Sequence, residues 1–315
     1  MPRVRELVVP AAAHATRLDR FLARWFSTWS RSALRRGVDA GEVCDGEGRP
    51  LKASALLREG MVLRIAIPGI APTSEPPPLP PVLYEDDRVL VLDKPAGLLA
   101  HPAGADFAWA AVGLAKEARP GDLIDLVHRL DRDTSGVLVL SKDHAAAASL
   151  KGAFKAGRVI KRYEAIVKGE VPWGSRQLTG AIGPADGVIR IQMAVRPDGL
   201  TARTDVEVVD RQPGLTRVRC RLYTGRTHQI RVHLAHEGFP LLGDRMYGVP
   251  PEVFLRAWEE GVDDWVIAQA GAPRQALHAA SVELPHPDGH ILTVCAPFPE
   301  DLTGWWADPS VLPGG

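Results

Sequence analysis

A proline-rich segment at residues 68–81 constrains the fold of this chain more than any other feature. It contains seven prolines and shows no hydrophobic periodicity. Proline lacks a backbone N–H and fixes φ, so such a run resists helix and sheet and behaves as a semi-rigid extended spacer. A peptide-recognition motif is the alternative, but a position between two patterned segments favours a linker. The sequence therefore predicts a domain at residues 1–67, a linker at 68–81 and a second domain at 82–315.

An amphipathic helix is the clearest element expected in residues 1–67. Its apolar face holds Leu18, Phe21, Leu22, Trp25 and Phe26, and another face holds Arg17, Arg20 and Arg24. A second helix should run from Arg31 to Val38 after Ser30, a favourable N-cap, and residues 61–67 alternate like a half-buried strand. Arginines on exposed helical faces either solubilise the surface or bind phosphates, and the pattern alone leaves both interpretations open.

Strand patterns outnumber helix patterns in residues 82–315. Two apolar runs at 82–92 predict a hairpin, and the four apolar residues at 137–140 predict a short buried strand. Further strands are expected at 161–168, 188–195, 202–209, 216–223, 277–284 and 290–295, and helices at 107–118, 145–156 and 227–237. Strands that seldom alternate with helices favour an α+β fold with a mixed, mainly antiparallel sheet and flanking helices, rather than a doubly wound one.

Composition and missing signatures exclude several classes of protein. The chain has neither a membrane-length apolar segment nor the apolar core of a signal peptide at residues 1–6, which predicts a cytoplasmic protein. The three cysteines, Cys44, Cys220 and Cys295, are far apart and suggest neither a disulfide framework nor a thiolate metal site. No P-loop, dinucleotide-binding glycine pattern or nucleophile elbow is present.

Basic residues are concentrated locally although the formal net charge is zero. Residues 211–233 contain six arginines and no acidic residue. Strand alternation within that run places Arg217, Arg219 and Arg221 on one face, which is either a solvated sheet face or part of a phosphate-binding surface. Local basic surfaces, rather than overall charge, would therefore have to bind any nucleic acid.

Four charged residues immediately precede the buried strand at 137–140. They are Arg129, Asp131, Arg132 and Asp133. Charges at the mouth of a core element either pair with one another or face a ligand. Both aspartates are also good turn formers, and 133–136 is an expected turn, so spacing does not separate Asp131 from Asp133 as the functional carboxylate.

The helix expected at 227–237 carries the second group of candidate residues. Arg231 shares a face with His228 and is a candidate partner for a buried carboxylate, because a guanidinium can hold one bidentately and keep it ionised. His228, His233 and His236 suggest a metal site, but helical spacing turns His228 well away from His233. We therefore predict no metal site.

Ordered motifs along residues 82–300 resemble the RluA family of RNA pseudouridine synthases. They are His128–Gly136 with the strand that follows, Lys94–Gly97 with His101, Lys161–Tyr163, Gly225–Leu234, Gly243–Gly248, and Leu277–Ala279 with Ala296–Pro299. Residues 17–22, 30–32, 51–54 and 60–63 resemble an S4 RNA-binding domain, a usual companion of this family. The two resemblances support each other. The chain departs from the RluA pattern at 103–125 and again at 250–275, an acidic segment with two tryptophans.

The resemblance implies a role for individual residues. Asp131 would be the catalytic aspartate, Tyr163 would stack on the target ring and Arg231 would pair with the aspartate. Arg129 would fill the stack vacated by the flipped base and Ile230 would pack beneath that base. Further substrate contacts would come from Arg226, His228, Lys94 and His101, and S4-like RNA contacts from Arg17, Arg20, Arg31 and Arg35. Plainer roles stay open, because Tyr163 suits a core position and Arg129 could pair with an aspartate.

The implied activity is isomerisation of uridines in RNA. An enzyme that acts on free nucleosides is disfavoured, because it would make the S4-like part and the arginine runs superfluous. The expected substrate is large-subunit ribosomal RNA, the expected cofactor and metal are none, and the expected state is a monomer. Two alternatives stay open: a non-catalytic RNA-binding or ribosome-assembly factor, and a pseudouridine synthase acting on tRNA.

Overall fold

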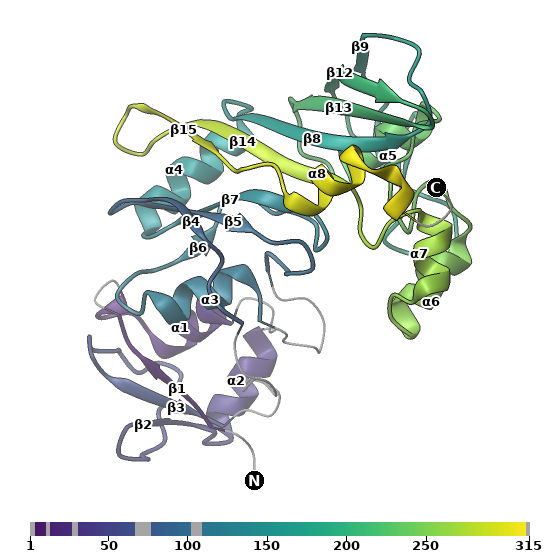
Figure 1. Cartoon of the computed structure of the whole chain (residues 1–315). Coiled ribbons are helices and arrows are strands. Elements are labelled where there is room, and N and C mark those ends of the chain that lie inside the picture. The colour runs from purple at the N-terminus through teal and green to yellow at the C-terminus, as the bar shows by residue number, and fades with distance from the viewer. Residues whose placement is uncertain (1–3, 11–12, 27–30, 67–76, 102–108, 313–315) are drawn as a thin grey trace. The chain divides into compact units, whose positions relative to one another are not determined.

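The computed structural model of the chain describes residues 4–10, 13–26, 31–66, 77–101 and 109–312 (Figure 1). It divides into two compact units. One comprises Met1–Val91, Leu98–Arg129 and Val139–Lys151, and the other Leu92–Gly97, Leu130–Leu138 and Gly152–Gly315. Most of the expected linker lies outside the described residues, so the domain boundaries at 67/68 and 81/82 stay predictions.

The N-terminal part of the first unit is a three-stranded antiparallel sheet with two helices. Its elements are β1 (Arg5–Val8), α1 (Leu18–Trp25), α2 (Arg31–Asp39), β2 (Val43–Asp45) and β3 (Val62–Ile65), with strand order β1-β3-β2. The expected apolar face of α1 is confirmed, because Leu18 and Leu22 are completely buried. The strand expected at 61–67 is β3, and α2 begins where expected, although Ser30 lies outside the described residues.

The rest of the first unit begins with the expected hairpin. Its elements are β4 (Val82–Glu85), β5 (Val89–Lys94), α3 (Ala111–Ala118) and β6 (Asp125–Leu126), while β5, β7 (Ser135–Ser141) and α4 (His144–Lys155) contribute residues to both units. The helix expected from residue 107 is described from Ala111 onward. Among the described residues, no helix has both the length and the apolar character that crossing a membrane requires.

One large mixed sheet runs through the rest of the chain. Its further strands are β8 (Ile160–Lys168), β9 (Ser175–Leu178), β12 (Thr204–Gln212), β13 (Leu215–Leu222), β14 (Leu277–Pro285) and β15 (Ile291–Cys295). The strand order is β4-β5-β7-β14-β8-β13-β12-β9, with β15 paired to β14 and β6 to β7. The pair β14–β7 is parallel, whereas β14–β8, β8–β13 and β13–β12 are antiparallel. This confirms the predicted α+β class.

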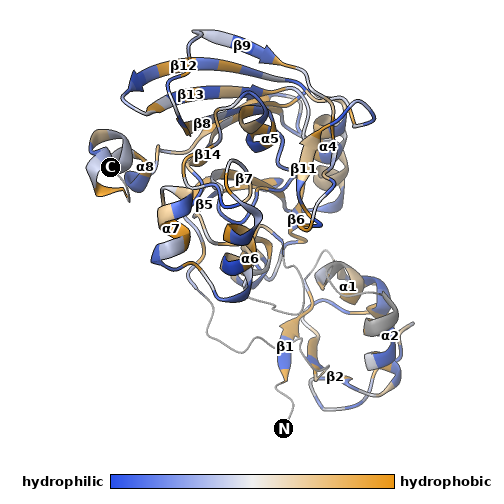
Figure 2. Cartoon of the chain, turned by 90° about the vertical axis from the view of Figure 1, so that its right-hand side faces the viewer, coloured by the Kyte–Doolittle hydropathy of each residue, from blue (hydrophilic) through white to orange (hydrophobic). Residues whose placement is uncertain are grey.

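In its described residues, the second unit contains four α-helices in addition to part of α4. They are α5 (Gln229–His236), α6 (Pro251–Glu259), α7 (Asp264–Ala270) and α8 (Glu300–Ala307). Helix α5 lies beneath the curved strands β12 and β13 in Figure 2 and contacts β12 directly. Helices α6 and α7 occupy most of the acidic segment 250–275 and pack against each other. The sequence prediction included α5 but not α6, α7 or α8.

The prediction of a strand at 188–195 is largely wrong. Only β11 (Met193–Val195) is a strand there, paired with β10 (Ile182–Pro184), while Val188 and Ile191 are exposed. Ile189 is buried in a hydrophobic cluster that includes Ile182 of β10, but residues 188–192 are not in a strand, so the apolar spacing misled the prediction.

The arginine face of β13 is present as predicted. Burial alternates along the strand, with Val218, Cys220 and Leu222 buried, and Figure 2 shows alternating hydrophobic and hydrophilic segments there. The arginines, however, meet carboxylates on neighbouring strands. The carboxylate of Glu164 on β8 lies 3.5 Å (Oε2) from Arg217 Nη2 and 3.9 Å (Oε1) from Arg219 Nη2. Phosphate binding by this face stays a prediction, and part of its positive charge is already balanced.

Gly136 fixes how closely β7 approaches β14. Its φ is +108°, and it lies opposite Ala279 in the parallel pair. A Cβ at this position would lie 2.3 Å from the Ala279 carbonyl oxygen. Only glycine fits such a contact, and the turn immediately before β7 is positioned by it.

We expect Gly136→Ala to lower the free energy of unfolding, since backbone strain alone costs roughly 1–3 kcal/mol. Gly152→Ala is the matched control, because Gly152 lies in α4 with nothing within 4 Å of the added Cβ. That variant should be stabilised by about 0.5–1 kcal/mol. Urea unfolding measures both, and equal effects of the two substitutions would contradict the assignment.

Candidate active site

A tight turn over residues 131–134 presents the two candidate aspartates. The Thr134 N–H donates to the Asp131 carbonyl oxygen over 3.2 Å, and β7 begins at Ser135. The turn expected at 133–136 is therefore placed two residues too late. The side-chain amide of Gln275 donates to the Thr134 hydroxyl over 2.7 Å, which holds the far end of the turn.

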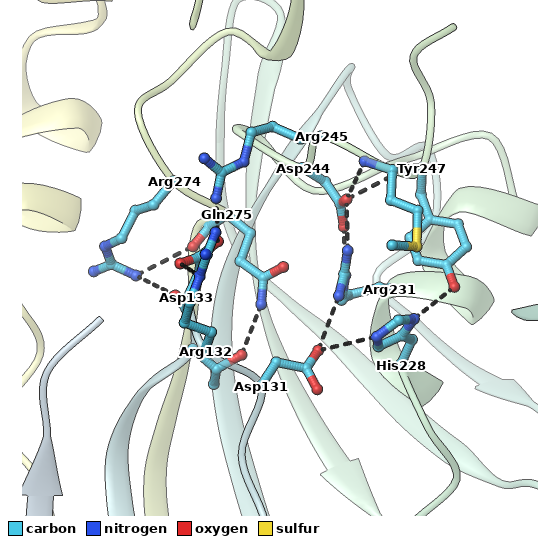
Figure 3. Close-up of polar contacts among 12 residues, drawn as sticks. Asp131, Arg132, Asp133, His228, Arg231, Asp244, Arg245, Tyr247, Arg274 and Gln275 are labelled. Atoms are coloured by element: carbon cyan, nitrogen blue, oxygen red, sulfur yellow. Dashed lines mark hydrogen bonds and ion pairs between the residues drawn. The ribbon is translucent and has the colours of Figure 1, made fainter. Parts of the chain in front are cut away.

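Asp133 is tied to the protein around it. Its carboxylate forms an ion pair with Arg245 and accepts from Arg132 Nε over 3.1 Å, while Arg274 donates to its carbonyl oxygen (Figure 3). The two aspartates that spacing did not separate are thus separated by their partners. Asp133 anchors the turn, as expected.

Asp131 faces a different partner, the buried guanidinium of Arg231 on α5. Arg231 Nη1 donates to Asp131 Oδ2 over 3.0 Å, so the expected pairing is confirmed. The same guanidinium holds Asp244 with two further bonds, from Nε over 2.7 Å and from Nη2 over 2.9 Å. Asp244 is buried and also accepts the backbone N–H groups of Met246 and Tyr247. One arginine therefore joins a fixed carboxylate to the candidate catalytic one.

The charges around Asp131 decide its protonation state. Burial would raise the pKa of its carboxyl group, but the positive charge of Arg231 outweighs this and the pKa is lowered. Burial would also lower the pKa of Arg231, but Asp244 and Asp131 raise it further above its usual value. Asp131 is therefore an anion at neutral pH, with 33% of its side chain still exposed.

His228 lies near the same oxygen of Asp131 that Arg231 contacts. It precedes α5 in the left-handed conformation, with φ of 56°. Its Nδ1 lies 2.9 Å from the Tyr247 hydroxyl, and its Nε2 lies 3.9 Å from Asp131 Oδ2 (Figure 3). Burial, followed by the charge of Arg231, lowers the pKa of His228 to about 4, so the imidazole is neutral at pH 7.

The loop 243–248 supplies partners for all three of these groups. Asp244 binds Arg231, Arg245 pairs with Asp133, and Tyr247 contacts His228. At Gly243 φ is +74°, and a Cβ there would lie 1.8 Å from the Arg274 carbonyl oxygen. The sequence comparison included this segment as a motif but gave its side chains no roles. The sequence did contain a signal for such roles, because Asp244, Arg245 and Tyr247 lie between Gly243 and Gly248.

Other residues predicted for the site lie close to this cluster. Tyr163 of β8 is buried, and burial, followed by the charge of Asp131, raises the pKa of its hydroxyl. Ile230 is buried in α5. The Lys94 ammonium is also fully buried and donates to the carbonyl oxygens of Pro95 and Arg132, 2.9 Å each. Burial lowers the pKa of Lys94 to about 7. Lys94 thus supports the Asp131 turn, and its contact with substrate stays a prediction.

The remaining predicted residues are placed as follows. Arg226 is half-buried, and its Nε donates to the Thr201 carbonyl oxygen over 3.0 Å. Arg129 is exposed and His101 half-buried, and both belong to the first unit. The S4-like arginines lie on α1 and α2 or just before them: Arg17 pairs with Asp19, Arg35 pairs with Asp39, and Arg20 is exposed. The side chain of Arg31 lies outside the described part. The RNA contacts assigned to these residues stay predictions.

The histidines of the α5 region have structural partners. His233 is buried, with Nδ1 2.9 Å from the Thr204 hydroxyl and Nε2 2.8 Å from the Gly180 carbonyl oxygen. Within the described ranges, no group of three or more histidine, cysteine, aspartate or glutamate side chains could hold a metal ion. The site is best described as one ionised carboxylate between a buried arginine and a neutral histidine. Such a group can act as a nucleophile or as a general base.

Known proteins share both the sequence and the fold of this chain. Residues 88–236 match the family described as RNA pseudouridylate synthase. "Ribosomal large subunit pseudouridine synthase D" of Xanthomonas campestris is 39% identical over 319 residues, covering 95% of this chain and 90% of the relative. The chain belongs to the RNA pseudouridylate synthase family. An uncharacterized RNA pseudouridine synthase of Chloroflexus aurantiacus is 38% identical, covering 95% of this chain and 91% of the relative.

A solved structure extends this agreement to the fold. The human RNA pseudouridylate synthase domain containing 1 superposes with a TM-score of 0.56 at 26% identity, covering 71% of this chain and 86% of that one. The predicted membership in the RluA family of pseudouridine synthases is confirmed, and the protein is an isomerase. The 131–134 turn, Tyr163 and α5 all lie within the residues matched by the family.

Asp244→Asn should destabilise the protein strongly, since removing one partner of a buried ion pair costs about 3–5 kcal/mol. Asp301→Asn is the matched control. Asp301 also holds an arginine, Arg274, through two bonds of 2.6 and 2.8 Å, but its side chain is 41% exposed. Exposed pairs contribute about 0–1 kcal/mol. Urea unfolding measures both, and similar losses would show that burial of the Arg231–Asp244 pair is unimportant.

The double variant Arg231→Gln/Asp244→Asn should raise the pKa of Asp131. It removes the cation that lowers this pKa, and burial, which raises it, remains. In the native protein the pKa of Asp131 is lower than in the unfolded chain, where it is about 3.9. This difference stabilises the fold at pH values above about 3.9, and the stabilisation is lost as the pH falls through the pKa of the folded state.

Carbon-13 NMR titration of the carboxyl groups measures the change, with the Asp131 signal assigned by its absence in Asp131→Asn. The control is Arg196→Gln/Asp198→Asn, which removes an exposed ion pair with 2.9 Å between Arg196 Nε and Asp198 Oδ1. It should leave the pKa of Asp131 unchanged. An unaltered Asp131 pKa in the first variant would show that Arg231 does not control its ionisation.

Proposed function

We propose that this protein converts specific uridines of large-subunit ribosomal RNA to pseudouridine, with Asp131 as the catalytic carboxylate. The observation that carries the proposal is the contact of Asp131 with Arg231, which keeps the carboxylate ionised while a third of its side chain stays exposed. The printed name of the Xanthomonas relative supports ribosomal RNA as the substrate.

The chemistry of the reaction suits a single positioned carboxylate. Isomerisation breaks the bond between C1′ and N1 of the uridine and forms one between C1′ and C5. The hydrogen at C5 leaves as a proton and N1 takes up a proton, so the two balance. No electron is gained or lost and no group is imported, so the reaction as written needs neither a redox cofactor nor a second substrate. A carboxylate beside the sugar and the ring can act as nucleophile or base.

The other site residues fit a flipped-out nucleotide. An enzyme that acts on a base must take it out of the stack, and a side chain inserted in its place lowers the cost. We assign that insertion to Arg129, stacking on the target ring to Tyr163 and packing beneath it to Ile230. Tyr163 and Ile230 are buried and can form the floor of a pocket that excludes water. Arg226, His228, Lys94 and His101 complete the proposed substrate set.

The N-terminal part is proposed to bind RNA as an S4-like domain. It consists of residues 1–67, followed by the linker 68–81 and the catalytic domain 82–315. Its RNA contacts are assigned to Arg17, Arg20, Arg31 and Arg35, and α1 and α2 have the amphipathic burial that such a helical pair needs. We further propose that the protein works in the cytoplasm as a monomer.

Asp131→Asn should abolish turnover. Loss of a positioned acid–base group costs about 10²–10⁴-fold, and loss of a nucleophile costs more. The assay uses ribosomal RNA labelled with tritium at uridine C5, because the isomerisation releases that label to water. RNA binding by the variant, measured separately, should be retained.

Asp198→Asn is the control, because Asp198 is an exposed carboxylate that pairs with Arg196. It should release tritium at the native rate. Undiminished release from Asp131→Asn would remove Asp131 from the mechanism. If the native protein binds RNA but releases no label from any RNA, it is a binding factor, and label released from tRNA alone would identify the other substrate class.

A further inference from the structure

The Tyr247 hydroxyl is enclosed by partners that determine which way it donates. Tyr247 is buried, and its oxygen accepts the Met193 backbone N–H over 3.0 Å. Its other contact is with His228 Nδ1, at 2.9 Å. Burial raises the pKa of the hydroxyl, so it keeps its hydrogen at neutral pH. That hydrogen needs an acceptor, because an unsatisfied buried donor costs roughly 1–3 kcal/mol.

His228 Nδ1 is the acceptor that the geometry supplies. Within the described part of the chain, Met193 and His228 are the hydrogen-bond partners shown for this hydroxyl, and the Met193 N–H can only donate. A neutral imidazole carries one hydrogen. If Nδ1 accepts from Tyr247, the hydrogen is on Nε2, and Nε2 is the ring nitrogen 3.9 Å from Asp131 Oδ2. The two rings meet edge to face, with centroids 5.7 Å apart, which restricts rotation of the imidazole.

We propose that Tyr247 is a positioning residue for the isomerisation, whose hydroxyl holds His228 as the Nε2–H tautomer with that hydrogen directed towards Asp131. The inference rests on the proposed function, because it concerns the same carboxylate. Arg231 donates to Asp131 Oδ2 directly, and His228 presents a second donor to the same oxygen. Shortening the distance between His228 Nε2 and Asp131 Oδ2 by less than an ångström completes that hydrogen bond. The two donors then hold the carboxylate in one orientation. Neither donor is free to turn, since Asp244 fixes Arg231 and Tyr247 fixes His228.

Nitrogen-15 NMR of the RNA-free protein tests the tautomer without relying on activity. In protein labelled on histidine, the signals of His228 are assigned by their loss in His228→Gln. We expect a protonated Nε2 and an unprotonated Nδ1 at pH 7, and a mixture of tautomers in Tyr247→Phe. A hydrogen on Nδ1 in the native protein would overturn the proposal, whatever the outcome for Asp131→Asn. Conversely, tritium release by Asp131→Asn would end the proposed mechanism and leave the tautomer result intact.

A double-mutant cycle tests the positioning role. Tyr247→Phe should lower kcat about tenfold, the equivalent of one hydrogen bond, with KM for the RNA nearly unchanged. His228→Gln places an amide N–H near the position of Nε2 and needs no acceptor bond at Nδ1, so it should retain more activity than His228→Leu. In the His228→Gln background, Tyr247→Phe should change kcat less than about twofold.

The cycle separates positioning from a purely structural effect. Tyr247→Phe also leaves the Met193 N–H unpaired, and that loss is the same in both backgrounds. An equal fall in kcat in the two backgrounds would therefore overturn the proposal. Tyr84→Phe removes a hydroxyl that donates to Asp86 over 2.6 Å in the other compact unit, and should leave kcat unchanged.

Discussion

The site depends on the buried guanidinium of Arg231, which is shared between two carboxylates. Asp244 is completely enclosed and is held by two arginine N–H groups and two backbone N–H groups. A buried ion pair of this kind seldom adds net stability, because desolvation of both charges offsets their attraction. What it provides is geometry: the third arginine donor is fixed in space before any RNA arrives. Asp131 is then held at one oxygen while a third of its side chain stays exposed.

A few non-local contacts bring this arginine to the Asp131 turn. The turn is held by Lys94 through the Arg132 carbonyl oxygen and by Gln275 through Thr134. The loop 243–248 reaches the same place with Asp244, Arg245 and Tyr247. Glycines at 136 and 243 permit backbone approaches that no side chain would allow. The carboxylate is therefore positioned by contacts between residues that lie 38 to 141 positions apart in sequence, and each contributes through backbone carbonyls or buried polar groups.

Periodicity was sufficient to predict most of the framework. The alternation of β13 and the apolar face of α1 are local patterns, and burial follows them closely. The short elements β9 and β10 and helices α6 to α8 were missed, because their patterns are too brief or are interrupted by charged residues. In the site, the pairing of Arg231 with Asp131 was expected from helix geometry and family resemblance. Asp133 is distinguished from Asp131 by its partners, among them Arg245, which lies more than a hundred residues away in sequence and is not revealed by spacing.

The arginine-rich run at 211–233 shows the same limit for electrostatics. It contains no acidic residue in sequence, yet Glu164 of β8 and Glu207 of β12 lie beside Arg217 and Arg219 in the sheet. An arginine gains affinity for nucleic acid by neutralising a phosphate and releasing its counterions. An arginine already paired with a glutamate on a neighbouring strand gains less in this way. The sequence run therefore overstates the charge available to RNA on this face. An arginine matters for RNA affinity only to the extent that the folded sheet leaves its charge unbalanced, and that balance is set by strand register.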